Sequence, residues 1–338
     1  MNRLSGALGL RRFSEDEAID EAGLLGAVTY GTGIQYCHPL SSGIVPMPAL
    51  PSGGTTHMAW YAGESFTAGS SGNLQYRHDD NVLFGFIALH EAEFSSDSQA
   101  CALQQATRAA YTTIFDTLKK TGFTYLTRCW NYLPHINVDD DGLERYRNFN
   151  IGRQEAFIAA RRSHLAGSPS ACALGTAEGC FIVYFLASRA EPHAIENPRQ
   201  MSAYYYPDQY GPNSPAFSRA ALLQLDGTEV LFISGTASIM GHESVHLGDV
   251  AGQTAETLRN IEAVVAQANL KSLFGGFSTR DLCMKVFIRN REDWERVNQV
   301  LREYLGDNID VTCLQADICR AELLVEIEAF GFCYGVGG

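Results

Sequence analysis

The last part of the chain alternates apolar and acidic side chains. The apolar positions are Leu323, Val325 and Ile327, and the acidic ones are Glu326 and Glu328. Successive side chains of an extended strand point to opposite faces, so the pattern predicts a strand with an apolar face packed under helices and both carboxylates on the other face. Two ionised carboxylates side by side repel each other. Such a pair is therefore either solvated, as on an edge strand, or part of a site where one member keeps its proton.

Apolar runs and helical spacing predict the other elements. In the first part of the chain we expect strands over 82–94, 124–133 and 180–186, a helix capped by Asp97 or Ser98, and a helix over 143–162. In the second part we expect a hairpin of 220–225 and 228–234 around Asp226–Gly227, a helix through 255–265, a strand over 283–288, a helix capped by Asn290 and ended by Gly306, and strands over 311–316 and 322–330.

The two parts show the same order of strands and helices. This predicts an α+β protein made of two similar units, residues 1–190 and 191–338, each with its helices on one face of a sheet. The segment 191–215 between them contains four tyrosines. We interpret it as a long ordered loop, because tyrosines are poorly suited to a solvated tether.

Composition restricts the class of protein. The 338 residues are 46% hydrophobic and 19% charged, and the net charge is −13, which argues against a nucleic-acid or anionic-membrane surface. No apolar run reaches the length of a membrane span, and Met1 to Asp20 does not resemble a secretion signal. The nine cysteines lack the close spacing of zinc sites, and the histidines form no HExxH pattern, so we expect reduced thiols, a cytoplasmic protein and no metal.

Several sequence blocks resemble a known superfamily. The run from Asp249, with 284–305 and 323–331, is similar to the reactive-intermediate deaminases, whose fold resembles the trimeric chorismate mutases and whose ligand sites lie in clefts between neighbouring units. In that superfamily an arginine that binds the substrate carboxylate stands at the start of the penultimate strand. The corresponding position here falls near Val311, so the resemblance does not predict a plain deaminase site.

The chain as a whole resembles a narrower group, the chorismatases. The matching blocks are 128–137, 142–157, 202–220, 234–250 and 316–328. Members of this family cleave chorismate to pyruvate and either a dihydroxycyclohexadienoate or 3-hydroxybenzoate. The members that form the aromatic product resemble this chain in having a cysteine seven residues before the catalytic glutamate. Those positions here are Cys319 and Glu326.

The resemblance implies a role for each of these two residues. Cleavage of the enol ether of chorismate most simply starts with protonation of its methylene carbon, so Glu326 would be the general acid and must keep a proton near neutral pH. Burial, Glu328 or the anionic substrate would each favour that proton. Cys319 would act either as a nucleophile or as a hydrogen-bonding and acid–base partner. The competing interpretations are a solvated strand glutamate and an inert buried thiol.

The two carboxylates of chorismate imply arginine partners. The expected substrate-binding residues are Arg153, Arg219, Tyr206, Tyr210, Asn131 and Gly211, with Arg128 and Arg320 as weaker candidates. Surface ion pairs for the arginines and stacking for the tyrosines are the alternatives. Small residues at 235–238 and 241–244 are interpreted as letting the substrate ring approach the backbone.

The predicted activity is therefore a cofactor-free conversion of chorismate to 3-hydroxybenzoate and pyruvate. A hydrolytic chorismatase is the first alternative, and a deaminase-fold protein that binds small metabolites without turnover is the second. The expected partner is chorismate itself, with no nucleic acid and no membrane. The sequence leaves open whether the protein is a monomer or a homo-oligomer.

Overall fold

The computed structural model describes residues 8–14, 17, 19–33, 42–63, 65–94, 100–140, 142–162 and 168–335. Within these residues, three sheets of seven, six and four strands form the framework, together with two short two-stranded ribbons. The seven-stranded and six-stranded sheets each carry two α-helices, which pack on one face of their sheet.

The first unit is built on the seven-stranded sheet. Its elements are β5 (Thr67–Ser71), β6 (Leu74–His78), β7 (Val82–Leu89), α1 (Ala102–Thr121), β8 (Tyr125–Pro134), α2 (Arg145–Ala159), β11 (Ser170–Thr176) and β12 (Phe181–Ser188). Leu103, Ala110 and Ile114 of α1 are buried against this sheet, as their helical spacing predicts.

The second unit repeats this order on the six-stranded sheet. Its elements are β13 (His193–Ile195), β14 (Ala220–Leu225), β15 (Thr228–Ala237), α3 (Val250–Asn269), β18 (Cys283–Ile288), α4 (Trp294–Leu305), β19 (Asp310–Gln315) and β21 (Val325–Tyr334). The turn between β14 and β15 uses Asp226 and Gly227, and Gly227 has a φ of 71°. The predicted hairpin is thus confirmed.

The strand orders of the two sheets correspond one to one. The order β6-β7-β12-β8-β11 in the first matches β14-β15-β21-β18-β19 in the second, and in both the pair before and after the second helix is parallel. The predicted α+β architecture of two similar units is therefore confirmed. The division between residues 190 and 191 stays a prediction.

One short strand crosses from the second unit to the first. β20 (Asp317–Ile318) follows β19 in the chain but pairs with Leu174 and Gly175 of β11, at the edge of the seven-stranded sheet. The segment that follows β20 is thereby fixed against the first unit.

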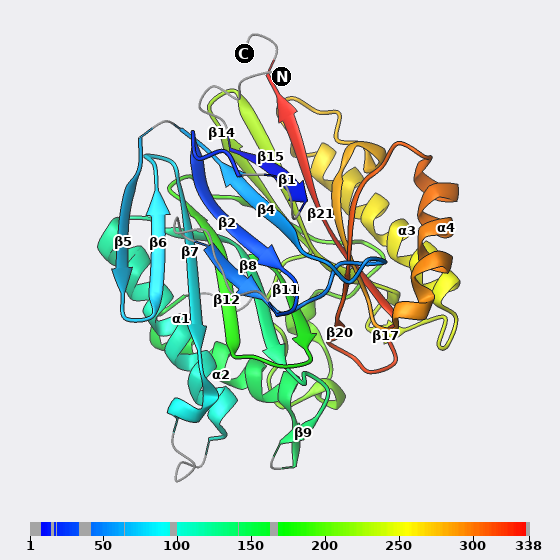
Figure 1. Cartoon of the computed structure of the whole chain (residues 1–338), viewed down its shortest axis with the longest axis horizontal. Helices are drawn as coiled ribbons and strands as arrows, with labels where there is room; N and C mark the ends of the chain where they lie inside the picture. Colours follow the sequence, from blue (N-terminus) through cyan, green and yellow to red (C-terminus); the bar gives the residue numbers. More distant parts are fainter. Residues whose placement is uncertain are drawn as a thin grey trace.

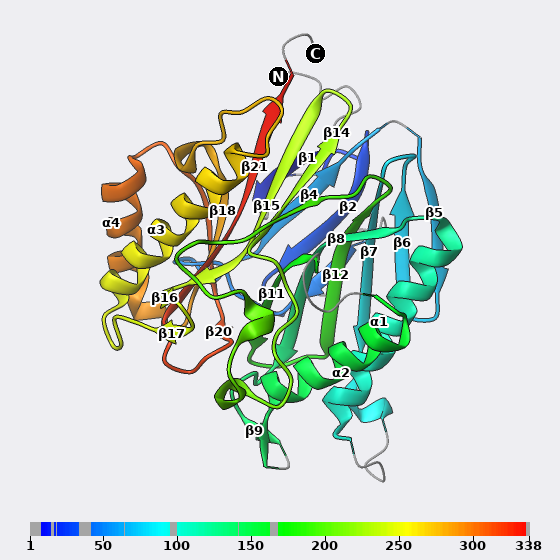
Figure 2. The same ribbon diagram turned by 180° about the vertical axis from the view of Figure 1, so that it is seen from behind.

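The four-stranded sheet was not predicted. It consists of β1 (Gly9–Ser14), β2 (Leu24–Tyr30), β3 (Ser42–Val45) and β4 (Thr56–Tyr61), in the order β1-β4-β2-β3. Figure 1 shows β1, β2 and β4 in front of the two large sheets, and Figure 2 shows the four helices on the opposite side. Met58 and Trp60 of this sheet pack in one cluster with Trp130 of the first unit and Phe330 of the second.

The remaining elements are short. They are η1 (Glu91–Glu93), β9 (Asp139–Asp140), β10 (Leu143–Glu144), η2 (Ala203–Tyr205), η3 (Asp208–Tyr210), β16 (Ile239–Met240), β17 (Glu243–Ser244), η4 (Thr279–Asp281) and η5 (Arg291–Asp293). The segment 191–215 holds β13, η2 and η3, and Tyr206 within it is buried. No helix of the described part of the chain is long and apolar enough to cross a membrane.

Several sequence predictions on element ends need correction. The strand expected over 82–94 ends at Leu89, because the chain turns into the short helix η1. The last strand begins at Val325 rather than Glu322, because a turn closed by the Leu323 N–H and the Arg320 carbonyl precedes it. Leu323 therefore packs on the side of the four-stranded sheet, whereas Val325 and Ile327 pack under the helices as predicted.

The caps of two helices also differ from the prediction. The predicted cap residues Asp97 and Ser98 lie outside the described residues, and α1 begins at Ala102 with Cys101 in the N-cap position. The side chain of Asn290 donates to the Asp293 carboxylate (2.9 Å) instead of accepting from the helix backbone.

Candidate active site

A cavity of about 360 Å³ lies between the two units, and it shares Tyr146, Phe217, Gly235, Cys319 and Glu326 with an adjoining recess of about 40 Å³. Residues from α2, the segment 206–219, β15, the turn after β20 and β21 line it. The residues that line them include Glu144, Tyr146, Arg147, Arg153, Tyr206, Tyr210, Arg219, Gly235, Cys319, Arg320, Glu322 and Glu326.

Glu326 reaches the cavity from β21. Its side chain is 3% exposed, and no hydrogen bond or ion pair with another described residue holds its carboxyl group. Burial and the charge of Glu328 raise the pKa of Glu326 to about 8, although Arg128 acts in the opposite direction. At neutral pH the carboxyl group is therefore protonated.

Gly235 leaves room for that carboxyl group. It lies on β15 where the pairing with β21 is interrupted between Ile233 and Thr236. A Cβ atom at Gly235 would lie 2.0 Å from the Glu326 Oε1 atom. The backbone of Gly235 thus borders the carboxyl group of Glu326, and the expected approach of the substrate ring to this segment stays a prediction.

Glu328, two residues along β21, is fully buried among polar partners. Its carboxylate pairs with the Lys285 ammonium (2.5 Å) and the Arg128 guanidinium, and it accepts a hydrogen bond from the Trp130 indole (2.9 Å). Burial alone would raise the pKa of Glu328, but Lys285 and Arg128 outweigh burial and hold it below its usual range. Arg128 is thus part of a buried network and does not line the cavity.

Cys319 lies on the turn after β20 and lines both the cavity and the recess. Burial and the carboxyl group of Glu326 raise the pKa of Cys319 to about 12. The sulfur is therefore a neutral thiol at physiological pH. A neutral thiol favours the interpretation as a hydrogen-bonding or acid–base partner over that as a nucleophile, because the thiolate is the nucleophilic form.

Two residues outside the cavity hold this turn. The Arg289 guanidinium donates to the carbonyls of Ile318 (3.1 Å), Arg320 (3.0 Å) and Leu323 (2.8 Å). The side chain of Gln253 accepts from the N–H of Leu324 (2.7 Å). Sequence reasoning missed Arg289, because its partners on this turn and its further partner Asn137 are all distant from it in sequence.

Arg153 and Arg219, the two predicted carboxylate-binding residues, lie on different sides of the site. Arg153 of α2 lines the recess, and Arg219 lines the cavity. Both are 4% exposed, and in both the Nε–H group has no partner among the described residues. Arg219 also donates to the Tyr206 hydroxyl (2.9 Å) and the Met201 carbonyl (2.6 Å). Buried, incompletely bonded guanidinium groups are suited to bind carboxylates.

Arg320, a weaker candidate in the sequence, also lies in the cavity. Its guanidinium stacks on the Tyr210 ring at 4.0 Å from the centroid and donates to the His242 carbonyl (2.9 Å), while its Nη2 group has no partner among the described residues. Tyr210 in turn donates to the His242 carbonyl (2.7 Å). These contacts fix Arg320 beside the two predicted tyrosines.

The lining carries an excess of positive charge. The charged residues are Arg147, Arg153, Arg219 and Arg320, with Glu144, Glu322 and Glu326. Since Glu326 is protonated at neutral pH, four positive charges face two negative ones, and the net charge of the lining is two positive. A dianionic ligand would balance this charge.

Two predicted site residues lie elsewhere. Asn131 of β8 points to the helix side of its sheet, where its amide accepts from the Tyr111 hydroxyl (2.7 Å) and donates to the Cys172 carbonyl (2.8 Å). Gly211, with a φ of 130°, packs on the side chain of Arg147. Neither is among the residues that line the cavity.

Tyr146 of α2 was not singled out from the sequence but lines both the cavity and the recess. Burial and the proximity of Cys319 raise the pKa of its hydroxyl group. Tyr146 lies within the block 142–157, one of those that carry the family resemblance. That block is the feature of the sequence from which Tyr146 could have been identified as a site residue.

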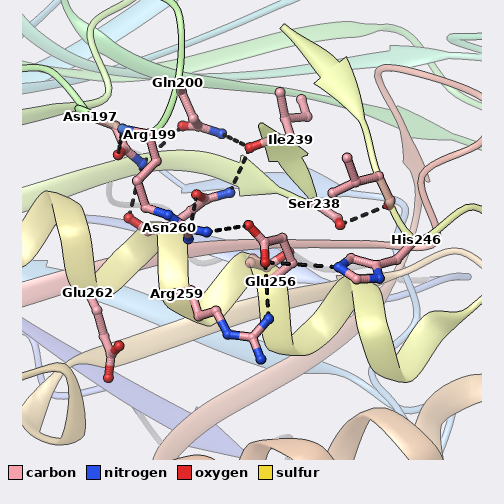
Figure 3. A network of polar contacts seen from close by, with 12 residues as sticks. Asn197, Arg199, Gln200, Ser238, Ile239, His246, Glu256, Arg259, Asn260 and Glu262 are labelled. Atoms are coloured by element: carbon pink, nitrogen blue, oxygen red, sulfur yellow. Dashed lines mark hydrogen bonds and ion pairs between the residues drawn. The ribbon is translucent and has the colours of Figure 1, made fainter. Parts of the chain in front are cut away.

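A polar network on α3 positions the segment that carries Tyr206 and Tyr210 (Figure 3). Arg199 donates to Glu256 (2.7 Å) and Asn260 (3.1 Å) of α3. The Asn260 amide also donates to the carbonyls of Ala237 at the end of β15 (3.1 Å) and of Ile239 in β16 (2.9 Å). Helix α3 thus fixes the segment that contains Arg199 relative to the end of β15, and both lead into parts of the chain that line the cavity.

Comparisons with known proteins agree with this architecture. Residues 58–187 match the family model "Chorismatase FkbO/Hyg5-like, N-terminal", and residues 214–333 match "Endoribonuclease L-PSP". The fold and the cavity thus define a protein of two tandem units, of which the second is of the L-PSP type.

Relatives that match most of the chain identify its family. A chorismatase of Streptomyces rapamycinicus is 39% identical over 80% of this chain and 80% of its own, and a 3-hydroxybenzoate synthase of Streptomyces hygroscopicus is 42% identical over 66% and 68%. A chorismatase crystal structure superposes with a TM-score of 0.87 at 32% identity, covering 96% of this chain and 98% of the other. The chain belongs to the chorismatase family.

Proposed function

We propose that the protein converts chorismate to 3-hydroxybenzoate and pyruvate. The observation that carries this proposal is a protonated, buried Glu326 next to the neutral thiol of Cys319, in a cavity whose lining has two net positive charges. The positive charge fits the two carboxylates of chorismate, and the proton fits cleavage of its enol ether. The relative named 3-hydroxybenzoate synthase supports the choice of product.

The chemistry needs a proton donor and a proton acceptor but no oxidant. Glu326 would protonate the methylene carbon of the enolpyruvyl group, and the oxocarbenium ion formed would lead to breakage of the ether bond to the ring. The hydroxyl oxygen on the neighbouring ring carbon must then move to the carbon that has lost the ether oxygen, and loss of one ring proton gives 3-hydroxybenzoate and restores the proton balance. Chorismate contains the same atoms as 3-hydroxybenzoate plus pyruvate, so no water is consumed overall.

The predicted absence of a metal and a cofactor is compatible with this scheme. The described residues include no group of three or more histidine, cysteine or acidic side chains placed to bind a metal ion. We further propose that the protein works in the cytoplasm, where the eight cysteines of the described part of the chain would stay free thiols.

Incubation of the pure protein with chorismate tests the proposed function. We expect pyruvate release together with a stable aromatic ultraviolet spectrum. Pyruvate with a non-aromatic diene would indicate the hydrolytic reaction, which consumes one water molecule. The absence of pyruvate would contradict the proposal and leave a protein that binds small metabolites.

Replacing Cys319 by alanine should change the product rather than stop the reaction. Protonation by Glu326 does not require the thiol, so pyruvate release should continue. Without the sulfur, water competes for the activated ring, and we expect a shift toward the dihydroxycyclohexadienoate. A chromatographic product ratio measures this shift. Cys313→Ala, which removes a cysteine from β19 outside the cavity, should leave the ratio unchanged.

If Cys319→Ala makes 3-hydroxybenzoate alone at the rate of the unmodified protein, Cys319 has only a packing role. Complete loss of pyruvate release would instead show that the thiol is needed in a step that precedes the separation of the paths to the two products.

Replacing Arg153 or Arg219 by alanine should weaken chorismate binding. Each change removes a charge-assisted contact worth about 1.5–3 kcal/mol, which corresponds to a roughly ten- to hundredfold rise in KM with a smaller effect on kcat. Steady-state kinetics measures both constants. Arg108→Ala, on the half-exposed face of α1, serves as the matched control. An unchanged KM in both variants would assign the carboxylate contacts to other residues, Arg320 first.

A further inference from the structure

Glu326 and Glu328 form a buried pair of carboxyl groups on one face of β21. Residues two apart in a strand are separated by about 6.5–7 Å along the chain. Both groups are essentially inaccessible to water. In such surroundings two carboxylates do not readily ionise together, so the pair holds one proton in preference to none. A catalytic acid requires that this proton be on the carboxyl group that faces the substrate.

The two members of the pair have different surroundings. Glu328 contacts two cations, Lys285 and Arg128, as well as the indole N–H of Trp130. Glu326 has no cation within ion-pair distance among the described residues, and its carboxyl group points into the cavity beside Gly235. The asymmetry comes from cross-strand register, since Lys285 stands opposite Glu328 and the apolar Phe287 stands opposite Glu326.

Neutral tyrosines complete the site of the Lys285 ammonium. It donates to the hydroxyls of Tyr30 (2.8 Å) and Tyr184 (3.0 Å), and Tyr30 contacts the Tyr132 hydroxyl at 3.0 Å. Burial raises the pKa of all three tyrosines, so they remain uncharged. With Glu328 as its third acceptor, the ammonium group has three partners, which is its full capacity.

The cluster joins all three sheets. Tyr30 comes from β2 of the four-stranded sheet, Tyr132 and Tyr184 from the first unit, and Lys285 and Glu328 from the second. A buried ion pair of this kind is a weak source of stability, because desolvation of the charges offsets much of their attraction. Its position two residues from the proposed acid suggests a role in the chemistry.

We infer that Lys285 and Arg128 fix Glu328 as a permanent anion and so assign the single proton of the carboxyl pair to Glu326. This inference rests on the proposed function of Glu326 as the acid. Glu328 is then a positioning residue, since it acts on the reaction through its neighbour and does not touch the substrate. Its charge favours retention of the proton on Glu326 until the methylene carbon of the substrate accepts it.

The titratable and charged groups near the pair also influence which of the two carboxyl groups holds the proton. Those near Glu326 or Glu328 are Arg128 of β8, Cys172 of β11, Tyr30 of β2, Tyr132 of β8, Tyr184 of β12, Lys285 of β18, Tyr146 and Arg153 of α2, and Cys319 after β20. The cavity that Glu326 lines also carries Glu144, Arg147, Arg219, Arg320 and Glu322. Arg128 favours the ionised form of Glu326, but its guanidinium is in direct contact with Glu328. Cys172, Cys319 and the tyrosines are neutral at physiological pH, because burial raises their pKa values.

The test is the pH profile of kcat for chorismate in wild type and in Glu328→Gln. In wild type the rate should fall as the pH rises through about 8, because Glu326 loses the proton it must donate. Glu328→Gln keeps the shape and removes the anion, so the fall should move to lower pH by about one unit or more. At pH values below the fall the variant should keep a rate within about tenfold of wild type.

Glu229→Gln is the matched control. It removes a different buried carboxylate, on β15, which is bonded to Ser272 and the Leu273 N–H and lies outside the cavity. Its pH profile should coincide with that of wild type. A profile of Glu328→Gln that also coincides with wild type would overturn the inference, because a merely structural Glu328 would change the rate at every pH alike.

A second measurement does not require the Glu328 variant to fold. Infrared difference spectra of the unliganded protein, titrated through pH 8, should show the carbonyl stretch of a buried protonated carboxyl group, and this band should be missing in Glu326→Gln. A band that persists in Glu326→Gln would place the proton on another group and overturn the inference. The spectra need no chorismate. They can therefore support the proton assignment even if wild type releases no pyruvate and the proposed function fails.

Discussion

Glu326→Gln should lower turnover of chorismate by roughly the 10²–10⁴-fold that general acid–base catalysis contributes. The amide fits the same space beside Gly235 but has no proton to transfer to the methylene carbon. Arg153, Arg219 and Arg320 are untouched by the change, so KM should stay within a few-fold of wild type. The measurement is the steady-state rate of pyruvate release over a range of chorismate concentrations.

The same Glu229→Gln variant serves as its control, since it removes a buried carboxylate without changing the cavity. Its rate should match wild type. If Glu326→Gln also turned over at the wild-type rate, the proton would come from another group, and Glu328 would be the first to examine.

Lys285→Met should reduce the free energy of unfolding by about 3–5 kcal/mol at neutral pH, the usual cost of removing one partner from a buried ion pair. Methionine fills a similar volume, so the loss comes mainly from the charge left on Glu328. The pKa of Glu328 is lowered in the folded protein, and the stability it contributes is present above its unfolded value of about 4.3 and disappears as the pH falls. The destabilisation should therefore shrink in acid.

Urea unfolding at neutral and acidic pH measures both effects. Lys271→Met removes an exposed lysine whose ammonium group donates to the Ala194 carbonyl, and it should change stability by less than about 0.5 kcal/mol. A loss below about 1 kcal/mol for Lys285→Met at neutral pH would show that Arg128 and Trp130 alone satisfy Glu328.

The sequence predicted the fold best where a structural feature depends only on residues close together in the chain. Alternation along β21 correctly placed Val325 and Ile327 under helices and the two glutamates on the opposite face. The four-stranded sheet was missed for a physical reason. β2 is buried on both faces, and a continuous apolar run of this kind does not distinguish a strand from a buried helix segment. Its partners β3 and β4 and the large sheets beneath it are fixed only by contacts distant in sequence.

The site was predicted mainly through the family blocks. The structure brings together Glu326, Cys319, Arg153, Arg219, Tyr206 and Tyr210 around the cavity and its recess, but their catalytic and binding roles stay predictions. Asn131 could not be placed from sequence, because alternation along β8 shows which residues share a face but not which face is toward the cavity. The contact between Lys285 and Glu328 depends on the register of β18 against β21, which the local sequence does not specify.

The strand β20 has a consequence for how this protein unfolds. It belongs to the second half of the chain but completes an edge of the first sheet, and the cluster of Trp60, Trp130 and Phe330 extends through all three sheets. Neither duplicated unit can therefore lose its structure without exposing apolar surface and strand edges of the other. Although the topology repeats, the chain should melt as one cooperative body, and its thermal denaturation should give a single calorimetric peak.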